Sequence, residues 1–229
     1  MTQKTILRIA AVISGISGIV ILTGVIYPIV SYNSTYSVNY TKLVSPIINP
    51  LEKVRGAVTT NTKGSVDYTQ ASTWFVGGAT EEDFTTSKVD YYTISIPKLK
   101  IDSASVAIGG EDLSKSLIQY PGTALPGKRG NSVIFGHSIL PEFYNPKNYI
   151  SIFSLLPMLK TGDLIYVNYD GISFIYRVET MFEVLPTDIQ VLDQDRDDSF
   201  LTLVTCVPPG ALGNPRRLIV RARVVPPEQ

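Results

Sequence analysis

The stretch SFLTLVTCVPPG, residues 199–210, contains the only cysteine of the chain. The stretch is rich in Val, Thr, Phe and Leu, which favour a strand. Pro208 and Pro209 then prevent the strand from continuing. The sequence therefore predicts a strand that carries Cys206 at its end. A lone cysteine is commonly a small buried hydrophobe, but a thiol at a strand end can also be a nucleophile. From this stretch alone both interpretations stay open.

Composition excludes several classes of protein. The chain has 229 residues, with 20 Lys and Arg against 20 Asp and Glu, so its formal charge is zero. This balance does not fit a nucleic-acid-binding protein, and we expect no nucleic-acid partner. One cysteine excludes an intramolecular disulfide, and one cysteine with one histidine excludes a zinc site of the usual spacing. The length suits one or two domains.

The amino-terminal residues predict a membrane anchor. Lys4 and Arg8 precede an uncharged run from Ile9 to Val30, which is long enough as a helix to span the roughly 30 Å hydrocarbon core. A cleaved signal peptide, the alternative, has a shorter apolar region and a small-residue cleavage site. The basic residues lie before the run, so the amino end should face the cytoplasm. We predict a cytoplasmic tip and transmembrane helix over residues 1–30, which cross the plasma membrane once.

Residues 31–89 differ in composition from the rest of the chain. Ser, Thr, Asn and Tyr are frequent and hydrophobic periodicity is poor, which predicts a stalk or partly ordered lead-in. We expect Trp74 and Phe75 to pack on the surface of the following domain. The alternative is that this segment covers a groove.

Residues 90–227 read as an all-β domain. Short segments rich in β-branched and aromatic residues alternate with Gly, Pro, Asp and Asn clusters, as in barrels and sandwiches. Several segments are apolar on both faces, which favours a closed barrel over a sheet open to water. The segments are 91–101, 103–110, 131–137, 163–171, 173–185, 200–206 and 217–225.

Three reactive side chains lie at the ends of these strands. His137, the only histidine, ends NSVIFGH, where Gly136 allows a tight departure of the backbone, and Arg217 begins the strand after Cys206. An antiparallel hairpin places Arg217 beside Cys206. The position of His137 does not follow from this topology. A structural role for each residue remains an alternative.

These residue types suit nucleophilic catalysis. A neighbouring imidazolium or guanidinium is expected to lower the pKa of a thiol from ~8.5 and so favour the nucleophilic thiolate. Histidine can return a proton to a departing amine. The fixed donors of arginine suit an oxyanion or a substrate carbonyl.

Three motifs together resemble the sortase family of cysteine transpeptidases. In that family a Thr-Leu-x-Thr-Cys strand carries the nucleophile, an Asn-x-Val-Ile-x-Gly-His strand carries the histidine, and an arginine opens the final strand. The matching residues here are 202–206, 131–137 and 217–220, and the resemblance extends over about residues 91–225. It implies a closed eight-stranded barrel whose groove binds a sorting peptide of Leu-Pro-x-Thr-Gly type.

The resemblance also implies a role for each residue. Cys206 attacks the threonine carbonyl of the sorting signal and forms a thioacyl enzyme. His137 protonates the departing amine and later deprotonates the incoming one, while Arg217 holds the substrate and the developing oxyanion. Substrate-binding roles fall to Thr205 and to Arg216, which stands next to Arg217.

The implied partners are secreted proteins with a carboxyl-terminal sorting signal and an amine acceptor, either a peptidoglycan precursor or a pilin lysine. Some sortases bind calcium through carboxylates in the loop before the histidine strand, but PGTALPGKRG, residues 121–130, is basic. We therefore predict no metal and no cofactor. A pilin-polymerising sortase, a hydrolytic cysteine peptidase and a non-catalytic surface scaffold remain alternatives, and the chain lacks the Asp-Pro-aromatic lid motif often found in pilus-building members.

Overall fold

The computed structural model of the chain describes residues 3–35, 41, 67–85, 89–209 and 215–226. The chain divides into two compact units, Met1–Val38 and Asn39–Gln229. The first contains the helix α1 (Gln3–Thr35), which continues beyond the predicted end of the anchor at Val30. Its segment Gln3–Gly24 is, within the described ranges, the one helix long and apolar enough to be a candidate membrane span.

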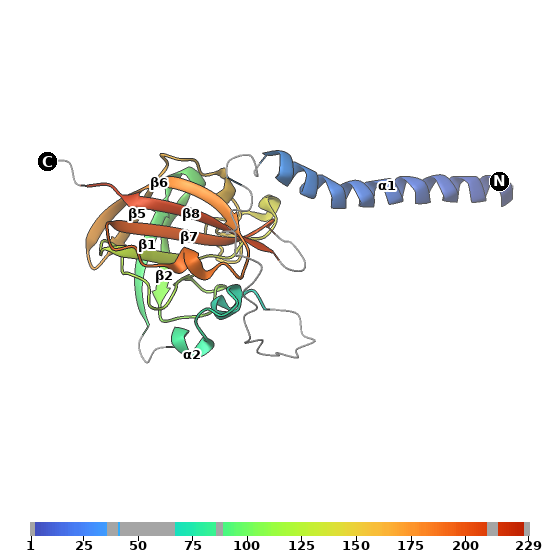
Figure 1. Cartoon of the computed structure of the whole chain (residues 1–229). Coiled ribbons are helices and arrows are strands. Elements are labelled where there is room, and N and C mark those ends of the chain that lie inside the picture. Colours follow the sequence, from blue (N-terminus) through green and yellow to red (C-terminus); the bar gives the residue numbers. More distant parts are fainter. Residues whose placement is uncertain (1–2, 36–40, 42–66, 86–88, 210–214, 227–229) are drawn as a thin grey trace, which may run out of the picture. The chain divides into compact units, whose positions relative to one another are not determined.

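The second unit contains a closed barrel of eight strands (Figure 1). Around the barrel the strands follow the order β1-β2-β3-β4-β7-β8-β6-β5. This confirms the all-β closed barrel expected from the sequence. The strands are β1 (Asp90–Ile96), β2 (Ile101–Ile108), β3 (Leu117–Gln119), β4 (Gly130–Phe135), β5 (Leu164–Tyr169), β6 (Ile172–Val184), β7 (Ser199–Val207) and β8 (Arg216–Val224). The short helices are η1 (Ala71–Trp74), α2 (Glu81–Phe84), η2 (Pro97–Leu99), η3 (Pro141–Phe143), η4 (Leu156–Met158) and η5 (Ile189–Leu192).

Strand β7, like β3 and β4, is buried along its whole length. It pairs in parallel with β4 on one side and antiparallel with β8 on the other, and all of its residues are buried. Alternate residues of a strand face opposite sides. Val204 and Cys206 therefore share one face, where they join a hydrophobic cluster with Val133 and Phe135 of β4.

Residues 67–85, here called the cover segment, pack on this face (Figure 1). Trp74 is completely buried and stacks on Phe135 with ring centroids 5.1 Å apart. Phe84, at the end of α2, meets the ring of Tyr120 edge-on at 5.4 Å. Part of the predicted lead-in is thus folded against the barrel, and Trp74 and Phe75 pack on the barrel as expected.

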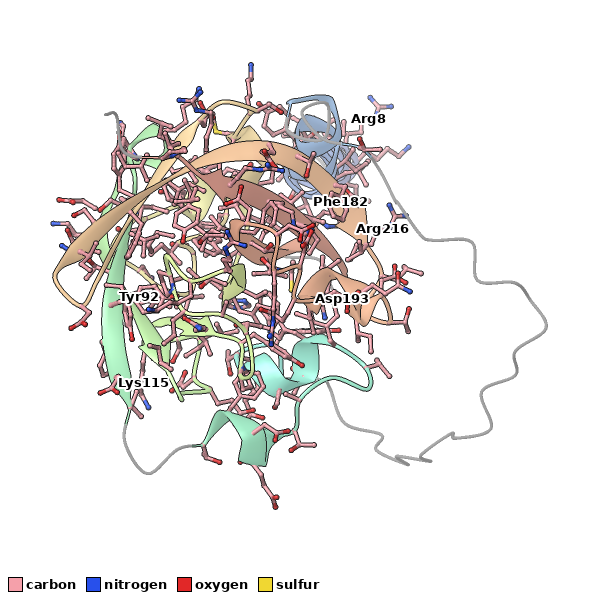
Figure 2. All side chains as sticks on the ribbon, turned by 60° about the vertical axis from the view of Figure 1, so that its left-hand side comes forward. Arg8, Tyr92, Lys115, Phe182, Asp193 and Arg216 are labelled. Atoms are coloured by element: carbon pink, nitrogen blue, oxygen red, sulfur yellow. The ribbon has the colours of Figure 1, made fainter. Side chains whose placement is uncertain are left out.

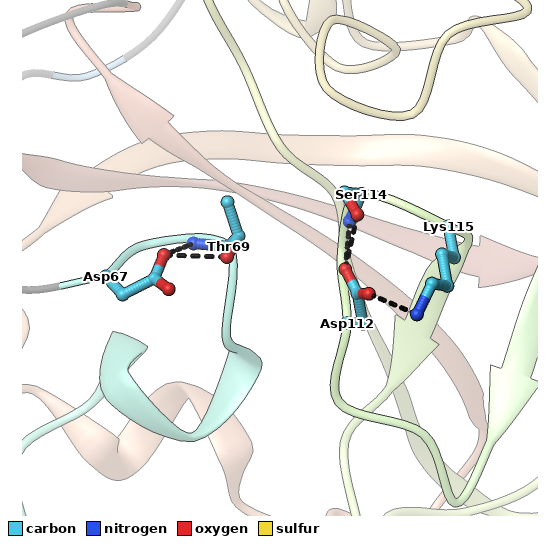
Figure 3. Close-up of polar contacts among 5 residues, drawn as sticks. All are labelled: Asp67, Thr69, Asp112, Ser114 and Lys115. Carbon is cyan, nitrogen blue, oxygen red and sulfur yellow. Dashed lines mark hydrogen bonds and ion pairs between the residues drawn. The ribbon is translucent and has the colours of Figure 1, made fainter.

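Backbone pairing and two turns fix the start of the cover segment. An antiparallel bridge joins Gln70 to Asp112 in the loop after β2. Figure 3 shows the turns beside this bridge. The Asp67 carboxylate accepts hydrogen bonds from the backbone and hydroxyl of Thr69, at 2.9 and 2.6 Å. The Asp112 carboxylate lies 2.8 Å from the Lys115 ammonium, which together with Ser114 lowers the pKa of Asp112 to about 2.

Gly136, which follows β4 directly, is required by close packing. A Cβ at this position would overlap the side chains of Phe153 and Leu117. Its φ is not among the positive values of the chain, so the tight departure from β4 does not use the left-handed region. The glycine lets the loop after His137 pack directly on the end of β4.

We expect Gly136→Ala to destabilise the domain by about 1–3 kcal/mol, because the added methyl overpacks a filled core. Urea unfolding followed by fluorescence of Trp74, the only tryptophan, measures this loss. Gly110→Ala is the matched control, since a Cβ there meets Ala107 Cβ at 3.3 Å and Ile118 Cδ1 at 3.5 Å. Equal losses in the two variants would contradict the packing explanation.

Candidate active site

The hairpin of β7 and β8 brings Arg217 to the sulfur of Cys206. The two residues are direct partners in the antiparallel register. Arg217 Nη1 lies 3.6 Å from Cys206 Sγ. The adjacency expected from strand order is confirmed, and Pro208 follows the end of β7 as the sequence predicts.

His137 reaches the same edge of the barrel through β4. In the parallel pairing of β4 with β7, Phe135 lies opposite Val204. Two residues further along each chain, this register would set His137 opposite Cys206, and the Ser138 hydroxyl, which donates to the Cys206 carbonyl at 2.8 Å, keeps the chain after β4 beside β7 there. The Gly136 amide donates to the Val204 carbonyl at 3.1 Å and so continues the pairing toward His137. Three segments distant in sequence thus place a thiol, an imidazole and a guanidinium at one end of the barrel.

The cover segment occupies the donors of Arg217. Nε and Nη2 donate to the backbone carbonyl of Trp74 at 3.0 and 2.8 Å, and Nη1 donates to the Pro215 carbonyl at 2.7 Å. The guanidinium carbon lies 5.5 Å from the ring centre of Tyr68 and 5.3 Å from that of Trp74, within cation–π range. Arg217 is only 1% exposed and Cys206 5%. The Trp74 carbonyl therefore accepts from the Nε and Nη2 donors that a substrate carbonyl could otherwise use.

The neighbouring arginine has a different partner. Arg216 Nη1 lies 2.7 Å from the Glu183 carboxylate, and its side chain is about half exposed at 45%. Figure 2 shows Arg216 among the side chains at the edge of the barrel. The Thr205 hydroxyl is buried and donates to the Gly136 carbonyl at 2.8 Å. Both side chains have protein partners in this structure, and their substrate-binding roles stay predictions.

Burial controls the protonation of the covered site. It raises the pKa of Cys206 to about 11, because the loss of hydration disfavours the thiolate more than Arg217 favours it. Burial likewise lowers the pKa of His137 below its usual value, with a smaller opposing effect of Asp67. At neutral pH the covered site holds a neutral thiol and a neutral imidazole. Arg217 lowers the thiol pKa as expected, but the larger effect of burial makes the net shift upward, so the expectation of a lowered Cys206 pKa is wrong.

Sequence reasoning missed three participants in the geometry. Tyr68 and the carbonyl of Trp74 hold Arg217, and the Ser138 hydroxyl donates to the Cys206 carbonyl at 2.8 Å. A backbone carbonyl leaves no signal in a sequence, whereas the serine directly after His137 was visible. In the part of the chain that the structure describes, no group of three or more His, Cys, Asp or Glu side chains could hold a metal ion.

Comparison with known families agrees with the barrel. The family model of the Sortase domain matches residues 94–225. The chain belongs to the sortase family. This sortase is accordingly a cysteine transpeptidase. No curated protein matches the chain.

Solved sortase structures share the fold. A lid mutant of sortase A from Corynebacterium diphtheriae is 31% identical, with a TM-score of 0.53 over 62% of this chain and 74% of that one. Sortase C-1 from Actinomyces oris is also 31% identical, with a TM-score of 0.51 over 59% and 73%. A sortase D5 transpeptidase from Clostridium perfringens, at 24% identity and a TM-score of 0.50 over 64% and 93%, is similar in fold.

We expect Trp74→Ala to expose the thiol. Removal of a buried aromatic side chain typically lowers the free energy of unfolding by about 3–5 kcal/mol. Here the lost contacts are those that hold the cover segment on the barrel. The rate of modification of Cys206 by a methanethiosulfonate reagent should therefore rise at least about tenfold. A tenfold rise needs the free energy of opening the cover segment to fall by only about 1.4 kcal/mol. Trp74→Phe keeps a ring on Phe135 and is the control. Equal rates in the wild type and Trp74→Ala would show that the cover segment does not limit access.

The pH dependence of alkylation tests the protonation of the thiol. In the wild type the rate with iodoacetamide should still be rising above pH 9, toward a midpoint near 11. Because the folded-state pKa lies above that of an unfolded cysteine, its contribution to stability is full below ~8.5 and is lost as pH rises toward 11. In Trp74→Ala the midpoint should move to lower pH. A wild-type midpoint below 8 would contradict this electrostatic account.

Proposed function

We propose that this sortase is held in the plasma membrane by α1, with its amino end in the cytoplasm and the barrel outside. It cleaves a sorting signal of Leu-Pro-x-Thr-Gly type in secreted proteins and transfers them to an amine of the cell wall. The observation that supports this best is the 3.6 Å approach of Arg217 Nη1 to Cys206 Sγ, with His137 level with the sulfur. In this proposal residues 1–30 anchor the protein, 31–89 lead into the barrel, and 90–227 form the catalytic domain.

The first half-reaction forms a thioester. Cys206 Sγ attacks the threonine carbonyl carbon while His137 takes the thiol proton, and Arg217 donates to the developing oxyanion. The bond between threonine and glycine then breaks, and His137 gives its proton to the departing amine. In the covered site both pKa shifts oppose this proton transfer, since burial raises the pKa of the Cys206 thiol and lowers that of the His137 imidazole. Movement of the cover segment would rehydrate both groups and so reduce this opposition.

The second half-reaction resolves the thioester. An incoming amine attacks the acyl carbon and passes a proton to His137, and the sulfur leaves and is protonated. Arg217 again donates to the oxyanion. If water is the acceptor, the products are those of a peptidase, so acceptor competition decides between transfer and hydrolysis.

Access to these groups requires movement of the cover segment. The Trp74 carbonyl occupies the donors that Arg217 would offer to the peptide. The Trp74 ring also covers Phe135 on the face that carries Cys206. The peptide therefore competes with the cover segment for one surface, and binding includes the free energy of displacing it.

Mass spectrometry of the detergent-solubilised full chain tests this function. Incubation with a Leu-Pro-x-Thr-Gly peptide should give an acyl adduct on the wild type and none on Cys206→Ala, which should fold normally. His137→Ala and Arg217→Ala should lower turnover by at least about 10²-fold. Arg216→Ala is the matched control for Arg217 and should lower turnover less. Undiminished turnover by Cys206→Ala would refute the assignment, and products that do not change when glycine or lysine amines are added would indicate hydrolysis.

A further inference from the structure

The pairing of β4 with β7 continues past the end of β4 through a side chain. The last backbone bond runs from the Gly136 amide to the Val204 carbonyl at 3.1 Å. In a regular parallel ladder the next bond in this direction would join the Ser138 amide to the Cys206 carbonyl. Here the Ser138 hydroxyl donates to that carbonyl at 2.8 Å. A hydroxyl thus takes the place of the backbone donor where the chain leaves the sheet.

A second hydroxyl ties the chain on the other side of His137. Thr205, which precedes Cys206, donates its hydroxyl to the Gly136 carbonyl at 2.8 Å. Both neighbours of His137 are thereby fastened to β7. The His137 carbonyl itself accepts the Phe153 amide at 3.1 Å.

The imidazole has no equivalent support of its own. His137 Nδ1 is buried and has no hydrogen-bond partner among the described residues. In many nucleophilic enzymes a third group orients the histidine through this type of bond. The orientation of the His137 ring therefore depends on how firmly its backbone is held.

We propose that Ser138, assisted by Thr205, is a positioning residue of this sortase. Its hydroxyl fixes the His137 backbone relative to Cys206 and so sets the distance over which the proton moves between sulfur and imidazole. Ser138 is buried and bonds to the Cys206 carbonyl, so it acts on the reacting atoms through the backbone. This inference rests on the catalytic roles proposed above for His137 and Cys206.

Loss of stability alone cannot test the proposal, because removal of any buried, bonded hydroxyl destabilises a protein. Ser151→Ala provides a matched control. Ser151 is also fully buried, and its hydroxyl accepts the Asn145 amide at 3.0 Å and donates to the Asn145 carbonyl at 3.1 Å. None of these bonds involves His137 or Cys206.

The single histidine supplies a direct readout. The full chain, without a histidine tag, is labelled with ¹⁵N-histidine and studied by NMR in detergent. Every imidazole signal then comes from His137. The experiment compares the ring signals, their pH titration, kcat and KM among the wild type, Ser138→Ala, Ser138→Thr and Ser151→Ala. All kinetic measurements are made well below the unfolding temperature of each variant.

We expect Ser138→Ala to lower kcat about 10- to 100-fold, because small displacements of catalytic groups are costly, with KM changed less than about twofold. Its His137 signals should shift or broaden. Ser151→Ala should retain the wild-type ring signals and kcat within about twofold, and Ser138→Thr, which keeps the hydroxyl, should recover most of kcat. Equal kcat and ring signals in Ser138→Ala and Ser151→Ala would overturn the proposal.

Two further outcomes separate this inference from the proposed function. Activity in Cys206→Ala would remove the proposed function itself. An inactive Cys206→Ala together with a fully active Ser138→Ala would remove only the positioning role. If Ser138→Ala fails to fold, Thr205→Val decides, since it preserves shape while it removes the reciprocal bond; unchanged kcat and His137 signals in that variant would overturn the proposal.

Discussion

The parallel pairing of β4 with β7 is the interaction on which the rest of the site depends. It aligns Phe135 with Val204, and this alignment brings His137 level with Cys206 where the two strands end. The antiparallel pairing of β7 with β8 then adds Arg217. Backbone hydrogen bonds of the barrel thus position the three reactive residues. Beyond the last backbone bond between β4 and β7, the hydroxyls of Thr205 and Ser138 hold the two chains together.

The same strand face gives the site its resting state. Val204 and Cys206 lie on an apolar surface that Trp74 and Phe75 of the cover segment fill. Burial there suppresses ionisation of the thiol despite the guanidinium beside it, because the cost of desolvation exceeds the attraction. The Trp74 carbonyl meanwhile satisfies Arg217. One packing interaction therefore both buries the sulfur and raises its pKa.

Much of the fold was predictable because its signals are local. Seven of the eight strands, the end of β7 before Pro208 and the β7–β8 hairpin follow from residue type and strand order, and the structure confirms them. The three-residue strand β3 was not among the expected segments. The contact of the Trp74 carbonyl with Arg217 and the direction of the Cys206 pKa were not predictable. Both depend on which distant segment packs on β7, and neither composition nor spacing encodes that choice.

The sequence by itself determined the strands, the apolar amino-terminal segment and the three reactive residue types, through periodicity, charge and motifs that act over a few residues. It also placed Arg217 beside Cys206, since a hairpin needs only local pairing. The tertiary structure alone decided that the strand carrying His137 pairs with β7, that Arg216 turns to Glu183, and that the cover segment packs over Cys206 and Arg217. These features arise from contacts between segments far apart in the chain, whose free energy depends on the packing of the whole domain.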